Sequence, residues 1–184
     1  LILTLAIFPF WLLFSYAQRE GNNKIDSLFV KLSSSIEDTS KVNILNQLSG
    51  ELRYINSDTS DYLAREALAL ATKLNYLPGI ADAHLRIGMQ CALLGKYEEG
   101  VKNCNDALEI FEELLNEASV LNKDKYLAKI GSTYNVMGHN RISQGNLPEG
   151  LRYSFLSLKI AEKRGNKKGI SYTVFNIGNI YAMQ

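Results

Sequence analysis

The sequence is poor in the residues that build metal centres and disulfide scaffolds, with two cysteines and two histidines among 184 residues. No CxxC pair and no Cys/His cluster has the spacing of metal ligands. The motifs HExxH and GxSxG, the P-loop and a GxGxxG between strand and helix are absent as well. We therefore expect no metal, no cofactor and no catalytic residue, and predict that this chain is not an enzyme.

The sequence also lacks an excess of charge of either sign, because 20 Lys and Arg residues face 19 Asp and Glu residues. A net charge of +1 gives no strong field to attract nucleic acid or an anionic membrane surface, so we expect neither as a partner. The hydrophobic content of 46% is that of a folded chain.

One long run without charge stands out, LILTLAIFPFWLLFSYA over residues 1–17. Its interruption at Pro9 and its ending in Ser15-Tyr16-Ala17 favour a secretory signal that is cleaved after Ala17. A membrane anchor that stays attached is the alternative, since a run of this length can span a bilayer. Either interpretation predicts an exported protein, periplasmic or membrane-anchored, whose membrane contacts are confined to this segment or to a region missing at the C-terminus.

A repeat of about forty residues runs through the rest of the chain, which we interpret as a fragment of a longer protein. Its three sets of small residues recur in step, each inside apolar spacing typical of helices. These sets are Ser49, Gly88, Gly138 and Gly178; Ala67, Ala107 and Ser157; and Ser60, Gly100 and Gly150. Because glycine inside a helix costs about 1 kcal/mol relative to alanine, its recurrence predicts that a second helix lies directly against the backbone there. Each unit is therefore predicted to be an antiparallel helical hairpin.

The segments that begin at Gly88 (GMQCALLGKYEEGVKNCNDALEIF) and Gly138 (GHNRISQGNLPEGLRYSFLSLKI) resemble the tetratricopeptide repeat (TPR) family. The resemblance implies an all-α, right-handed superhelical solenoid of antiparallel helix pairs. It divides the array at 41–184 into units at about 41–78, 79–122 and 123–168, with a partial unit at 169–184. Residues 18–40 are assigned to a linker and a capping helix.

Local signals predict where the helices begin and end. Asp38 opens the first helix, Gly95 and Gly145 end helices in left-handed caps, and LPGI (77–80) and KKGI (167–170) are joints between hairpins. A turn is predicted near Asn122. The last helix reaches Gln184 without a partner, so we expect an exposed apolar edge at this end.

The two cysteines and the two histidines can be explained by packing in the core as well as by a chemical role. Cys91 and Cys104 lie on the two helices of one hairpin at core positions, which is compatible with a disulfide or with two buried thiols. His84 takes the place of a core aromatic residue. His139 lies on the inner face of the array, where it could contact a ligand or be solvated.

The resemblance places a peptide-binding groove on the first helix of each unit. A mixture of amides, apolar residues and arginines suits an extended or helical peptide. The predicted lining is Asn46, Arg53, Tyr54, Leu85, Arg86, Met89, Asn135, His139, Phe175, Asn176 and Asn179.

We therefore predict a scaffold that binds a protein or peptide, similar to the periplasmic TPR input region of bacterial sensor proteins. A spacer array whose groove binds nothing tightly is one alternative. The other is the scaffold region of a larger enzyme, such as a sensor histidine kinase or a nucleotide cyclase, with its catalytic domain beyond Gln184. The oligomeric state cannot be deduced from the sequence.

Overall fold

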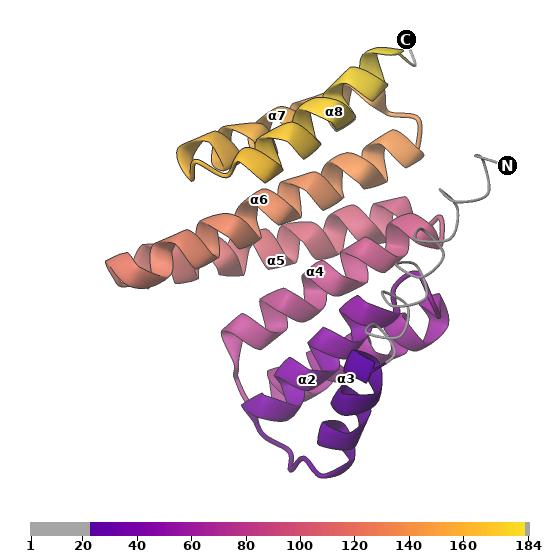
Figure 1. Cartoon of the computed structure of the whole chain (residues 1–184), viewed down its shortest axis with the longest axis vertical. Coiled ribbons are helices and arrows are strands. Elements are labelled where there is room, and N and C mark those ends of the chain that lie inside the picture. Colours follow the sequence, from indigo (N-terminus) through magenta and orange to yellow (C-terminus); the bar gives the residue numbers. More distant parts are fainter. Residues whose placement is uncertain (1–22, 183–184) are drawn as a thin grey trace, which may run out of the picture.

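The computed structural model describes residues 23–182, and all regular secondary structure in this part is helical (Figure 1). A helix over residues 23–33 precedes seven longer helices. These are α2 (Thr39–Leu52), α3 (Ser57–Lys73), α4 (Leu77–Leu93), α5 (Tyr97–Glu117), α6 (Val120–Ser143), α7 (Leu147–Lys163) and α8 (Lys167–Ala182). The predicted signal segment at 1–17 lies outside the described residues.

Consecutive helices pack as antiparallel pairs, α2 with α3, α4 with α5 and α6 with α7, and the pairs stack side by side up to α8 (Figure 1). The first helix of a pair also contacts the first helix of the next, α2 with α4 and α4 with α6. Because the second helices make no comparable contacts with one another, α2, α4 and α6 form the inner layer of a curved stack. The predicted all-α solenoid of helix pairs is confirmed.

The recurring glycines mark close contacts between helices where a partner helix is present. A Cβ atom added at Gly88 of α4 would lie 2.6 Å from Cys104 Sγ and 3.1 Å from the carbonyl oxygen of Gly100, both on α5. At Gly138 the carbonyl oxygen of Gly150 is 3.4 Å away, whereas a Cβ at Gly178 meets nothing within 4 Å. The predicted approach of helix to backbone thus holds at the first two positions and lacks a partner at the third.

The helix ends follow the predicted capping in most places. Gly95, Gly145 and Gly165 have φ of 72°, 87° and 63°, the left-handed conformation that glycine adopts at little cost. Asp38 accepts a hydrogen bond from the backbone N–H of Lys41 at 3.0 Å and so caps α2.

Three predicted helix boundaries are wrong. Residues 77–80 and 167–170 are not joints but the first turns of α4 and α8, because proline and glycine are tolerated where backbone N–H groups have no partner within the helix. The turn expected near Asn122 lies earlier, at Ala118 and Ser119, and Asn122 is in the first turn of α6.

Both ends of the stack behave as expected. Leu28 of the N-terminal helix is buried against α2 and α3, so this helix caps the first pair. At the other end α8 exposes about half or more of Tyr172, Val174, Phe175 and Tyr181. The predicted apolar edge at the C-terminal end is therefore present.

Cys91 and Cys104 are free and buried at the contact between α4 and α5. Burial raises the pKa of the Cys91 thiol to about 11. Burial also raises the pKa of the Cys104 thiol well above its ordinary value. The interpretation as two buried thiols, rather than a disulfide, is the one that the structure supports. His84, at the predicted core position, is partly buried, and its Nδ1 lies 2.9 Å from Asn103 Oδ1.

Candidate binding groove

Two clefts open on the inner layer of helices. The first, which we call the histidine cleft, has a volume of about 370 Å³ and lies between α4 and α6, closed by the end of α2 and by Tyr172 of α8. It contains the following predicted groove residues: Arg53, Tyr54, Met89, Asn135 and His139. The sequence analysis missed its other lining residues: Ala92, Leu93, Ser132, Val136, Ser143 and Tyr172.

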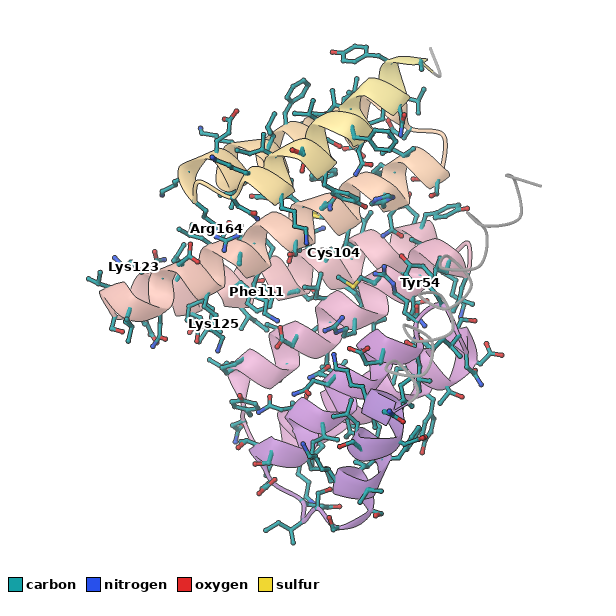
Figure 2. The ribbon with its side chains drawn as sticks, viewed as in Figure 1. Tyr54, Cys104, Phe111, Lys123, Lys125 and Arg164 are labelled. Atoms are coloured by element: carbon teal, nitrogen blue, oxygen red, sulfur yellow. The ribbon has the colours of Figure 1, made fainter. Side chains whose placement is uncertain are left out.

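Arg53 and Tyr54 form the rim of the histidine cleft just after α2 ends. The guanidinium of Arg53 lies over the ring of Tyr54, 4.3 Å from its centroid, and its Nη2 donates a hydrogen bond to the tyrosine hydroxyl. Tyr54 keeps 76% of its surface exposed, and Figure 2 shows it at the end of the groove beside α4. An exposed aromatic ring held by a cation is a ready contact surface for a partner side chain.

His139 stands on the opposite wall, on α6. Its Nε2 lies 3.2 Å from the hydroxyl of Tyr172 on α8. The residue lines the cleft and is exposed to solvent there. Burial lowers the pKa of His139 from the ordinary value of 6.5, and the positive charge of Arg53 lowers it further. A neutral imidazole that can donate or accept one hydrogen bond therefore faces the cleft at neutral pH.

We expect His139 to bind its proton at lower pH than the unfolded chain does. Below the ordinary histidine pKa of 6.5 the unfolded state takes up the proton first, so acidification through this range destabilises the fold. An NMR titration of the imidazole should show a midpoint below 6.5, and Arg53→Gln should raise that midpoint. A midpoint above the ordinary value would contradict this arrangement of the cleft.

The second cleft, which we call the basic cleft, also has a volume of about 370 Å³ and lies at the opposite end of the inner helices. Its charged lining residues are Asp82, Arg86, Lys125 and Lys129, and its neutral ones are Asn43, Asn46, Gln47, Tyr76, Pro78, Phe111 and Tyr126. Figure 2 shows Lys125 near the start of α6, on the opposite side of the molecule from Tyr54. Only Asn46 and Arg86 of this lining were predicted from the sequence.

The basic cleft holds more positive charge than its acidic residue can neutralise. Asp82 is the one carboxylate among the described residues that line either cleft, and its Oδ1 accepts from Lys129 Nζ at 2.5 Å. Lys125 packs over the ring of Tyr126, with its Nζ 5.4 Å from the ring centroid. The basic cleft thus carries an excess of positive charge in a protein whose net charge is +1.

The histidine cleft and the basic cleft both lie along α6, and we call them together the groove. Lys125 and Lys129 line the basic cleft near the start of α6, and Ser132 and Ser143 line the histidine cleft further along the same helix. Eighteen helical residues from Lys125 to Ser143 correspond to about 27 Å, the length of an extended peptide of about eight residues. The groove can therefore accommodate a peptide segment that runs along α6.

Four of the predicted groove residues lie outside both clefts. Leu85 is 4% exposed and packs in the core with α5 and α6, so this prediction is wrong. Phe175, Asn176 and Asn179 lie on α8 beyond the cleft walls, and Phe175 is 65% exposed there. Asn46 lines the basic cleft, but it is 4% exposed and donates from Nδ2 to the carbonyl oxygen of Gly79 at 3.3 Å, so it also ties α2 to α4.

Within residues 23–182, no group of three or more His, Cys, Asp or Glu side chains is placed to hold a metal ion. Over the same range no helix combines the length and the apolar character needed to cross a membrane.

No protein-family model matches the chain, and no curated protein matches its sequence. Solved structures do match. A Rap protein complexed with the competence and sporulation factor has 21% identity and a TM-score of 0.74 over 92% of this chain and 46% of the Rap chain. The apo form of RapI has 17% identity and a TM-score of 0.70, covering 95% of this chain and 62% of RapI. BtubC (BKLC) from P. vanneervenii has 21% identity and a TM-score of 0.68, covering 90% of this chain and 67% of BtubC.

These likenesses extend over nearly the whole described chain, which spans only about half to two-thirds of each matched protein. At such identities they establish the fold, a TPR-like helical repeat, and agree with the family resemblance of the sequence.

Proposed function

We propose that this chain is a non-catalytic scaffold whose groove binds a peptide or an exposed segment of a protein partner. The observation that carries the proposal is that two clefts of similar volume lie along the inner helices α4 and α6. The histidine cleft combines the apolar side chains of Met89, Leu93 and Val136 with hydrogen-bonding groups of Asn135 and His139. Such a combination suits a peptide, whose backbone needs hydrogen bonds while its side chains need apolar pockets.

The structural neighbours support a binding role. One Rap protein was solved in complex with the competence and sporulation factor, so a solenoid of this shape can hold a ligand. A likeness of fold does not by itself give a function, so the binding role is argued from the residues of the groove.

We also propose that the scaffold works outside the cytoplasm, as the input region of a signalling protein. The support for this is the uncharged run of residues 1–17, which ends in small residues before Gln18. Binding in the groove would then be the event that the signalling protein detects.

Blocking the groove tests the binding role. Ser132 is exposed on α6 and lines the histidine cleft, so Ser132→Trp should fill the groove without disturbing the core. On an array of random dodecapeptides capped at both ends, we expect affinities at least about tenfold weaker than for the wild type. Circular dichroism should show unchanged helicity.

The matched control is Asn105→Trp, which places the same ring on the exposed side of α5, outside both clefts. It should bind peptides as the wild type does. Equal binding by wild type and Ser132→Trp would exclude the groove as the binding surface.

A further inference from the structure

Arg86 of α4 is the unusual residue of the groove. Its side chain is mostly buried in the basic cleft, yet it makes no salt bridge with any acidic residue among those described. Its nearest recorded polar contact is weak, from Nη1 to Met89 Sδ at 4.0 Å. Burial holds the pKa of Arg86 below its ordinary value, although arginine stays charged at neutral pH. A buried charge without a partner is costly, and a bound anion would remove that cost.

The surroundings hold the Arg86 guanidinium in place. It lies against the backbone of Gly50 on α2, where an added Cβ would come within 2.6 Å of Nη1 and 2.8 Å of Cζ. The missing side chain at residue 50 therefore makes the space that the guanidinium occupies. The carboxylates of Asp82 and Glu51 attract Arg86 only from a distance, because they are paired directly with Lys129 at 2.5 Å and with Lys24 at 2.6 Å.

The position of Arg86 in the groove indicates whether the anion that it binds lies inside the peptide or at its end. Met89, which its guanidinium contacts, lines the histidine cleft, whereas Arg86 itself lines the basic cleft. Arg86 therefore lies between the two clefts, with one cleft on either side of its guanidinium. A segment that fills the groove would place an internal residue beside Arg86, not its own end.

We propose that the partner segment carries an internal acidic side chain, Asp or Glu, whose carboxylate pairs with Arg86, with Lys125 adding long-range attraction. This inference rests on the proposed function and specifies the class of peptide that the groove takes. A guanidinium can bind a carboxylate through two parallel hydrogen bonds, which fixes orientation as well as affinity. Such a pair in a cleft of reduced solvent access is stronger than one on the open surface.

The test uses the full chain and an array of dodecapeptides, acetylated and amidated, in which a central residue is Glu, Gln or Lys in otherwise identical random sequences. We expect Glu peptides to bind about tenfold more tightly than their Gln counterparts, as one charge-assisted hydrogen-bonded pair would give. This preference should weaken as salt is added. Lys peptides should bind more weakly than either.

Two variants distinguish the effect of the charge of Arg86 on the peptide preference from the effect of its position. Arg86→Gln should bind Glu and Gln peptides with equal affinity. Gly50→Ala keeps the arginine but pushes its guanidinium from its place, so the same loss of preference is expected with helicity retained. The control is Lys123→Gln, which removes a charge at the start of α6 outside both clefts (Figure 2) and should keep the preference.

Three other outcomes would each exclude one part of the proposal. If wild type binds Glu and Gln peptides equally, the acidic partner is excluded while the peptide-binding role stands. A second set of the same peptides keeps a free C-terminal carboxylate; if a preference that depends on Arg86 appears only in that set, the internal acidic residue is excluded. If no peptide of any set binds, the proposed function fails and this inference fails with it.

Discussion

Replacing Phe111 with alanine should lower the free energy of unfolding by about 4 kcal/mol, the usual loss for a large aromatic residue in a core. Phe111 of α5 is fully buried and is among the largest of the fully buried side chains. It packs in the cluster that α4, α5, α6 and α7 share, so its removal leaves a cavity between two repeats. Because it also forms part of the wall of the basic cleft, that cavity would open towards the groove (Figure 2).

Urea unfolding followed by circular dichroism measures this loss. The control is Phe155→Ala on α7, because Phe155 is 48% exposed and its truncation should change the free energy of unfolding by less than about 1 kcal/mol. Similar losses for the two variants would show that the second and third helix pairs do not share a core at Phe111.

The recurring small residues were sufficient to predict the order of helices and the way they pair. A residue without a side chain inside a helix has few uses other than close contact, and the contacts of Gly88 and Gly138 show that use directly. The beginnings of α4 and α8 could not be placed in the same way. Pro78 and Gly79 have the composition of a turn, but a Cβ at Gly79 would lie 2.7 Å from Val42 Cγ1 of α2, so this glycine serves a contact between helices.

The groove could be predicted in part, for reasons of helix geometry. Positions taken from the family pattern fall on the correct side of α2, α4 and α6 in most cases, but successive residues are about 100° apart around a helix. Leu85 therefore points into the core while its neighbour Arg86 lines the basic cleft. Lys125 and Lys129 were missed because α6 has 24 residues, and its additional first turns extend the groove beyond the family pattern.

The sequence could not predict that Arg86 lacks a salt bridge. Asp82 lies four residues before it on α4, a spacing at which an ion pair within the helix is common. The structure instead pairs Asp82 with Lys129 of α6, a residue 47 positions away. Only the stacking of helix pairs decides which of these partners the carboxylate takes.

Substituting valine at equivalent glycines of successive repeats should give three different results. Gly88→Val should lower the free energy of unfolding by about 3 kcal/mol, because its Cβ would meet Cys104 Sγ at 2.6 Å and the Gly100 carbonyl oxygen at 3.1 Å. A backbone carbonyl cannot move aside as a flexible side chain can, and valine has essentially one rotamer in a helix. The two helices α4 and α5 would have to separate.

The other two glycines provide matched controls for the same substitution. At Gly138 the nearest atoms to an added Cβ are 3.4 Å away, so Gly138→Val should lower the free energy of unfolding by about 1 kcal/mol. A Cβ atom added at Gly178 would meet no atom within 4 Å. Because valine has a slightly higher helix propensity than glycine, Gly178→Val should raise the free energy of unfolding by about 0.3 kcal/mol. The order of the three changes in the free energy of unfolding measures how closely a second helix approaches each glycine. Equal losses at Gly88 and Gly178 would mean that contact with a second helix is not what these glycines provide.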